Sequence, residues 1–214
     1  MFIQTEATPN PATLKFLPGR VVLPEGTFEA RDAEAAARSP LATRLFDVPG
    51  VAGVYLGHDF ISVTKAEDDN LGPQVKPAVL GAIMEHFQSG APALAEGHVA
   101  GSEDAEEFFD PADIETVETI KDLLETRVRP AVAGDGGDIT FRGYKEGVVY
   151  LEMKGACSGC PSSTATLRNG VQNLFRHFLP EIREVQAICT VEFRRADAKP
   201  QQVRPNISTM AAPP

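Results

Sequence analysis

The sequence predicts an α+β protein in which two small domains are joined by an acidic, flexible linker. Its 214 residues suffice for two modest domains, and an apolar content of 43% is ample for packed cores. Both strand-like and helix-like hydrophobic periods occur on each side of residues 90–112. That stretch holds six acidic residues and no Lys or Arg, so it is too polar to bury itself. We therefore expect domains at 1–89 and 113–193, a linker at 90–112, and a disordered tail at 194–214.

The first domain is predicted to mix short strands and helices. Strands are expected at 3–7, at 12–17, and in a hairpin formed by 51–56 and 60–64. Ser39 followed by Pro40 is a favourable N-cap and first-turn pair for a short helix. A second helical stripe runs from Val79 to Phe87, and Gly90 is placed to end it.

The second domain is predicted to have the order helix, strand, strand, helix, strand. Apolar residues recur every three or four positions from Ile114 to Val128, and Pro130 is expected to stop that helix. A Gly-rich turn at 135–138 leads into two strands, at 139–142 and 149–153. A helix then ends before Pro180, and a closing strand spans 187–193, with the apolar positions Ala187, Cys189, Val191 and Phe193 alternating along it.

The amino-acid composition limits which partners and which cellular compartment we expect for the chain. A net charge of −10 argues against a nucleic-acid partner, and no apolar run is long enough to cross a membrane. The first ten residues have neither signal-peptide nor transit-peptide character. Three cysteines do not make a disulfide framework, so we expect a reducing compartment. The expected location is a bacterial-type cytoplasm, with a mature mitochondrial chain as the alternative.

The main candidate for a reactive or metal-binding site is the pair Cys157 and Cys160, which lies where a predicted strand leads into a predicted helix. Pro161 suits the first turn of that helix, so both sulfurs are expected near its N-terminus. The unpaired N–H groups and the dipole there favour thiolates, either as nucleophiles or as metal ligands. Small polar residues around the pair argue against two cysteines that are merely packed in a core.

Three chemical interpretations of the pair remain open. A thioredoxin-like thiol–disulfide oxidoreductase also opens a helix with Cys-x-x-Cys, but here only one strand follows and no Trp precedes the motif. A zinc or iron–sulfur site held by cysteines needs four thiolates, and the loop supplies only Cys157 and Cys160. Cys189 is expected to be a buried structural thiol, and none of the four histidines has ligand spacing to the pair. A second copy of the chain completes either metal site most simply.

Two segments resemble a known family. Gly-Asp-Gly-Gly-Asp-Ile at 134–139 and Gly-Ala-Cys-Ser-Gly-Cys-Pro-Ser-Ser-Thr-Ala-Thr-Leu at 155–167 resemble the NifU carboxy-terminal domain. Thr-Pro-Asn-Pro-Ala-Thr-Leu-Lys-Phe at 8–16 resembles the Nfu amino-terminal domain. Together, in this order, they are similar to Nfu-type iron–sulfur scaffold and carrier proteins.

The resemblance implies a cluster carrier and not an enzyme. It implies a [4Fe–4S] cluster, or under some conditions a [2Fe–2S] cluster, bound between two protomers through Cys157 and Cys160. The implied partners are a second copy of the chain, a cluster donor, and client apoproteins that receive the cluster. Cys189 and the tail have no counterpart in the family motif.

Overall fold

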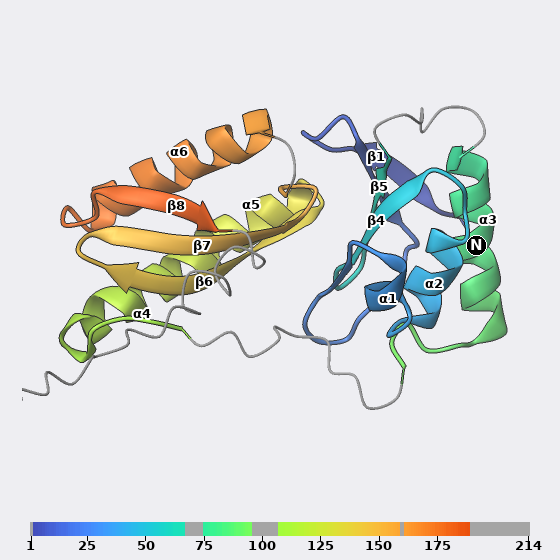
Figure 1. Ribbon diagram of the computed structural model, residues 1–214, viewed down its shortest axis with the longest axis horizontal. Helices are drawn as coiled ribbons and strands as arrows, with labels where there is room; N and C mark the ends of the chain where they lie inside the picture. Colours follow the sequence, from blue (N-terminus) through green and yellow to red (C-terminus); the bar gives the residue numbers. More distant parts are fainter. Residues whose placement is uncertain (1, 67–74, 96–106, 159–160, 189–214) are drawn as a thin grey trace, which may run out of the picture.

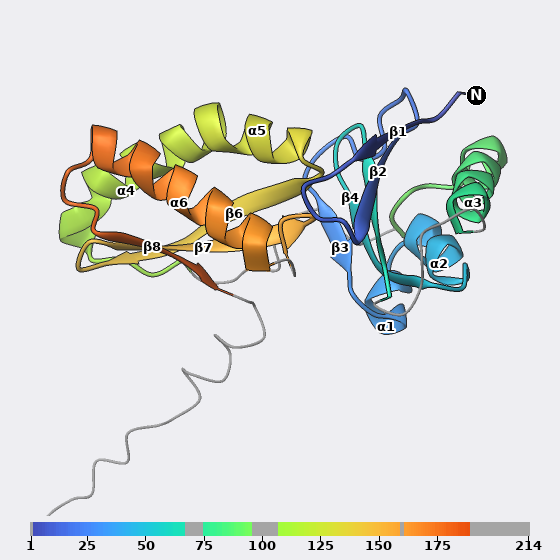
Figure 2. The same ribbon diagram turned by 90° about the horizontal axis from the view of Figure 1, so that it is seen from above.

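The computed structural model describes residues 2–66, 75–95, 107–158 and 161–188, and it confirms an α+β fold with two domains. Each domain has its own sheet and its own hydrophobic core. Figure 1 shows the two domains side by side, and Figure 2 shows the same pair from above. The expected tail at 194–214, the linker centre at 96–106, Cys160 and Cys189 lie outside the described residues.

The first domain is built on an antiparallel sheet of five strands in the order β1-β2-β5-β4-β3. Its strands are β1 (Gln4–Ala7), β2 (Thr13–Leu17), β3 (Phe28–Ala30), β4 (Val51–Leu56) and β5 (Ile61–Lys65). One face carries apolar residues such as Phe16, Ile61 and Val63, all fully buried against the helices. The other face carries Lys15, Tyr55 and Ser62, and the second domain lies on that side.

Three helices cover the apolar face: α1 (Ala33–Ala36), α2 (Pro40–Phe46) and α3 (Val75–Ser89). The Ser39 hydroxyl caps α2 by accepting the Ala42 N–H at 3.0 Å, as its sequence position predicts. Gly90 follows α3 with a φ of +69°, the left-handed conformation that ends many helices. His86 of α3 has a fully buried side chain.

The second domain begins with a continuous helical segment that does not stop at Pro130. After the short η1 (Pro111–Asp113), α4 (Ile114–Leu123) passes through a π-helical turn, η2 (Leu124–Val128), into α5 (Arg129–Gly134). The expected stop at Pro130 is therefore wrong. Pro130 lies in the first turn of α5, where a missing N–H is tolerated, and the π turn absorbs the change of register.

The second sheet has three strands in the order β6-β7-β8. The strands β6 (Gly137–Lys145) and β7 (Val148–Gly155) pair antiparallel, and β8 (Glu184–Ile188) pairs with β7 in parallel. The helix α6 (Pro161–Phe178) supplies the crossover that a parallel pair requires. β8 starts three residues earlier than the predicted closing strand, and its buried residue is Val185, whereas Ala187 is exposed.

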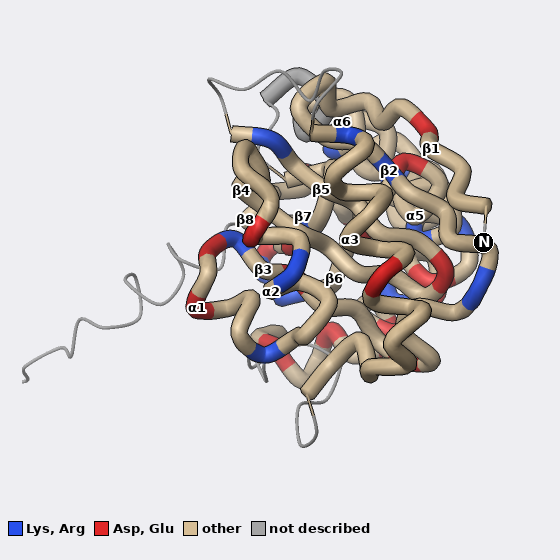
Figure 3. The backbone as a smooth tube through the Cα atoms, turned by 90° about the vertical axis from the view of Figure 1, so that its right-hand side faces the viewer, with Lys and Arg blue, Asp and Glu red and all other residues tan. Residues whose placement is uncertain are grey.

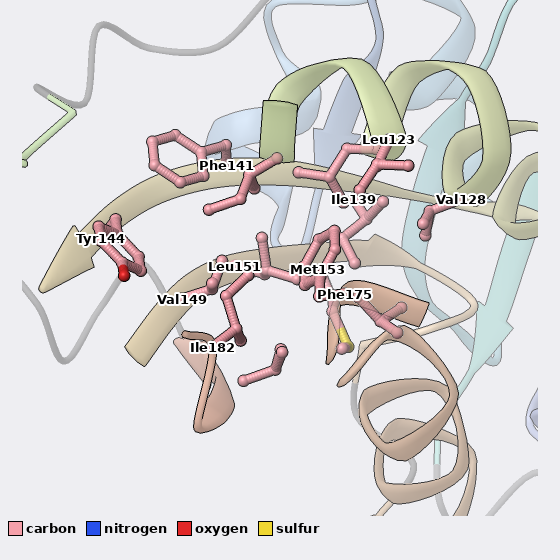
Figure 4. Packing of buried hydrophobic residues seen from close by; sticks show 14 of the residues in the cluster. Leu123, Val128, Ile139, Phe141, Tyr144, Val149, Leu151, Met153, Phe175 and Ile182 are labelled. Atoms are coloured by element: carbon pink, nitrogen blue, oxygen red, sulfur yellow. The ribbon is translucent and has the colours of Figure 1, made fainter. Parts of the chain in front are cut away.

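The core of the second domain fills the space between this sheet and its helices. Figure 4 shows side chains from the helical segment, the sheet and α6 meeting there, among them Leu123, Ile139 and Phe175. All three are at most 6% exposed. This packing fixes where β7 ends and α6 begins, and therefore where the cysteine motif lies. Among the described helices, none has both the length and the apolarity needed to cross a bilayer.

Candidate functional site

Cys157 lies in a turn that joins the end of β7 to the start of α6. Gly155 takes a φ of +65°, and its carbonyl accepts the N–H of Ser158 at 3.1 Å to close the turn. The N–H of Ala156 donates to the Gly136 carbonyl at 3.1 Å, which ties this turn to the one between α5 and β6. A Cβ on Gly137 would lie 2.8 Å from the Cys157 sulfur, so only glycine permits this approach.

The surroundings of Cys157 differ from those the sequence predicted. The side chain is 6% exposed and packs with the apolar core of the second domain. Burial, together with the nearby carboxylates of Asp135 and Asp138, raises the pKa of the thiol to about 12. The sequence predicts that the helix N-terminus favours a thiolate. In the cluster-free chain, desolvation and the acidic neighbours act in the opposite direction and favour the protonated thiol of Cys157.

Cys160 immediately precedes α6, whose first residue is Pro161 as predicted, but Cys160 itself is outside the described residues. The same holds for Cys189. Within the described ranges, no three His, Cys, Asp or Glu side chains gather closely enough to hold a metal ion. Among these residues, Cys157 is thus the soft donor that the structure places at the predicted site.

Arg129 holds Asp138 beside the cysteine turn. Its Nε and Nη2 atoms donate to the two carboxylate oxygens of Asp138 at 2.9 and 3.1 Å, and Nη1 donates to Glu125 at 2.7 Å. Hydrogen bonding to Asp138 raises the pKa of Arg129 above its ordinary value. Asp138 is therefore held in a two-point ion pair with Arg129. The i, i+4 spacing of Glu125 and Arg129 is a sequence signal for the ion pair between those two residues, whereas no such signal indicates the contact of Arg129 with Asp138.

A pocket of about 530 Å³ opens beside Cys157. Leu167, Val171 and Leu174 of α6 form one side, and Val128 contributes from the opposite helical segment. Pro9 of the first domain also lines it, so the pocket lies where the two domains meet. Its lining is mostly apolar, which suits a packed protein surface better than a small charged molecule.

The first domain reaches the turns around Cys157 with polar side chains that the sequence analysis missed. Lys15 donates to the Gly134 carbonyl at 3.0 Å, and Ser62 donates to the Gly136 carbonyl at 2.6 Å. The Glu29 carboxylate accepts the N–H of Gly155 at 2.9 Å. These partners are 74 to 126 residues apart in the chain, so no local sequence pattern indicates them.

Comparison with protein-family models divides the chain in the same way as its two sheets. Residues 3–90 match the model described as "Scaffold protein Nfu/NifU N terminal", and residues 120–186 match the model described as "NifU-like domain". The second match contains the turn with Cys157 and the start of α6. The described elements of each sheet fall almost wholly within one match.

Curated relatives align over nearly the whole chain. The protein of Drosophila sechellia named "NFU1 iron-sulfur cluster scaffold homolog, mitochondrial" is 46% identical over 98% of this chain and 73% of its own length. The human protein of the same name is 43% identical over 92% of this chain and 76% of its own length. A solution structure of a NifU-like protein from Saccharomyces cerevisiae covers 45% of this chain and 86% of its own, with 22% identity and a TM-score of 0.41. By its two domain matches and its curated relatives, the chain belongs to the Nfu family of iron–sulfur cluster scaffold proteins.

Proposed function

We propose that two copies of this chain hold one [4Fe–4S] cluster between them, each through Cys157 and Cys160. The observation that carries the proposal is the position of Cys157 in the turn before α6, within the NifU-like match and three residues from Cys160. The donor set fits the cargo, since thiolates are the preferred ligands of iron–sulfur clusters. One chain supplies half of the sulfur ligands at this motif, and the second copy supplies the others.

The cluster is cargo to be passed on, so the protein acts as a scaffold and carrier and not as an enzyme. Because each chain contributes two thiolates, a client apoprotein with free cysteines replaces them stepwise by ligand exchange. A site built from four ligands of one chain favours retention, whereas a site shared across an interface opens when the interface opens. A donor that assembles clusters and apoprotein clients that accept them are the partners this role requires.

A reducing compartment suits this chemistry, because the two cysteines must stay as thiols when no cluster is bound. The mitochondrial location in the names of the two curated relatives belongs to those relatives. For this chain we propose only a compartment that keeps thiols reduced. Both a bacterial-type cytoplasm and the mitochondrial matrix are such compartments.

Anaerobic reconstitution with iron and sulfide tests the proposal. We expect about four iron and four sulfide per dimer, measured by metal and sulfide analysis together with native mass spectrometry. Two iron and two sulfide per dimer would instead show a [2Fe–2S] cargo, and a single zinc in the colourless protein would show a structural metal site. Cys157→Ser and Cys160→Ser should each abolish cluster binding.

Cys189→Ser is the matched control, since the third cysteine is not in the motif, and it should retain the cluster. An iron-loaded protein that stays monomeric would contradict the shared site. Retention of the cluster by Cys160→Ser would contradict the assignment of ligands. Reversible formation of an intramolecular disulfide, with turnover of disulfide substrates, would favour the oxidoreductase alternative.

A further inference from the structure

One face of the first domain's sheet is polar and yet buried. It carries Lys15 on β2, Glu29 on β3, Tyr55 on β4 and Ser62 on β5, which we call the docking face. Ser62 is 1% exposed, Tyr55 2% and Lys15 7%. An antiparallel sheet with helices on one side usually leaves its other side to water. Here the second domain covers that side (Figures 1 and 2).

The docking face contacts the cysteine-bearing end of the second domain and satisfies its backbone groups. Lys15 and Ser62 donate to the carbonyls of the turn at 134–136, and Glu29 accepts the N–H of Gly155. These groups flank Cys157 on both sides, because the two turns are bonded to each other through Ala156 and Gly136. The contacts are therefore made to the loops that position the cysteine.

The fit between the two surfaces is so close that a methyl group at either turn would have to displace a neighbouring atom. A Cβ on Gly136 would lie 2.7 Å from the Ser62 hydroxyl oxygen and 3.3 Å from a methyl carbon of Thr8. A Cβ on Gly155 would lie 3.0 Å from the ring of Tyr55. Both glycines also have positive φ values, 81° and 65°, and the first domain packs directly against their backbone. Such complementarity indicates a specific contact between the domains.

The same end of the second domain must face another copy of the chain when a cluster is shared. Four thiolates around one cluster require the two cysteine turns to lie directly opposite each other. The docking face lies against the loops that flank this turn. We propose that the docking face is a binding surface for the cysteine end of this chain's own second domain, and that it competes with the cysteine end of a second copy. This inference rests on the proposed function.

Competition has a consequence for the loaded form. Pairing of two chains through a cluster displaces the first domain, and the linker keeps it attached. Lys15, Glu29, Tyr55 and Ser62 then become exposed, so the docking face is available to other proteins only while cargo is bound. The cluster-free chain keeps this surface covered.

Two substitutions on the docking face test the contact in the full-length chain without touching the second domain. Glu29→Lys removes the acceptor of the Gly155 N–H, and Ser62→Gln inserts a longer side chain against Gly136. In the cluster-free wild type, NMR should show slow hydrogen exchange at the Gly155 amide, and small-angle X-ray scattering should show a compact particle. Each variant should speed that exchange about fivefold or more and should enlarge the particle.

Glu34→Lys is the matched control, because it makes the same charge change on an exposed residue of α1. It should leave both the exchange rate and the scattering unchanged. Anaerobic cluster uptake should also be faster in Glu29→Lys and Ser62→Gln than in wild type, by about the same factor as the hydrogen exchange at Gly155. The loaded wild-type dimer should scatter as a particle with separated domains.

Fast exchange at Gly155 in the cluster-free wild type would overturn the docking contact. A loaded dimer whose domains stay docked would overturn the competition while leaving the proposed function intact. A wild-type chain that binds no cluster would overturn the proposed function and the competition together. The measurements on the cluster-free chain would in that case still decide whether the docking contact exists.

Discussion

His86 is a titratable residue that the fold of the first domain buries. Its side chain is fully buried in α3, and both ring nitrogens lack a hydrogen-bond partner among the described residues. Burial lowers the pKa of the imidazole, and the positive charge of Arg44 lowers it further. The folded first domain therefore holds this ring in its neutral form.

This burial predicts a pH-dependent stability for the first domain. Above the ordinary pKa of about 6.5, the ring is neutral in both the folded and unfolded states, so its protonation does not reduce the free energy of unfolding. As the pH falls below that value, the unfolded chain takes up a proton that the folded chain resists, so the free energy of unfolding decreases. Urea unfolding should show that wild type loses part of its free energy of unfolding between pH 7.5 and pH 5.5, and that His86→Leu loses less. His58→Gln, a change at an exposed histidine, should behave as wild type, and an equal loss in all three proteins would contradict the prediction.

At the residue scale, the sequence predicted the identity of the cysteine motif but not its surroundings. The Cys-x-x-Cys spacing and Pro161 place Cys157 before a helix, as the structure has it. The burial of Cys157 and its proximity to Asp138 depend on how β6, β7 and α6 pack, and no local pattern encodes that packing. Glu29 was beyond prediction for the same reason, since its bond to Gly155 spans 126 residues.

At the scale of elements, local signals predicted those boundaries that local chemistry sets. The Ser39 cap and Gly90 mark helix ends at the expected places. The elements β3 and α1 were missed because they are three and four residues long, too short for a hydrophobic period to appear. Pro130 misled the prediction because a π turn before it lets the helical segment continue.

The tight turn between β6 and β7 gives a prediction about one element. Glu146 and Gly147 have φ values of 51° and 83°, so both lie in the left-handed region that a two-residue hairpin turn requires. A Cβ at position 147 would also lie 2.8 Å from the Glu181 carbonyl oxygen. Gly147→Ala should therefore lower the free energy of unfolding by about 1–3 kcal/mol in urea titrations.

Gly81→Ala is the control for this change. Gly81 lies within α3, and apart from the neighbouring backbone of its own helix, no atom of the described residues is within 4 Å of the position its Cβ would take. The substitution should stabilise the protein by about 0.5–1 kcal/mol, because alanine favours a helix interior. Equal effects of the two substitutions would show that the turn conformation carries no cost.

At the scale of the whole molecule, packing is divided between two domains, while charges of both signs are spread over the chain. Figure 3 shows acidic and basic residues interspersed along the described backbone. The two cores share no residue, and hydrogen bonds from Lys15 and Ser62 join the first domain to the turn at 134–136. Composition and the positions of the family motifs predicted this division. The docking contact was not predicted, because it depends on the shape of two folded surfaces.

Separate cores predict separate unfolding transitions. Leu45 is fully buried in the first core, and Leu151 is fully buried in the second. Replacement of either by alanine should cost about 2–5 kcal/mol in its own domain, through lost burial and a cavity. Differential scanning calorimetry of the cluster-free chain should show each substitution lowering the midpoint of one transition. A parallel shift of both transitions by either substitution would show that the domains unfold as one unit.

The location of Tyr55 gives the molecule an intrinsic optical probe. The chain has no tryptophan and three tyrosines, so these phenols dominate its ultraviolet emission. The ring of Tyr55 lies against Gly155, two residues before Cys157, whereas Tyr144 and Tyr150 are near the opposite end of the β6–β7 hairpin. An iron–sulfur chromophore absorbs where tyrosine emits, and the efficiency of energy transfer falls steeply with distance. Quenching of Tyr55 therefore gauges, without any label, how far its domain lies from the cargo.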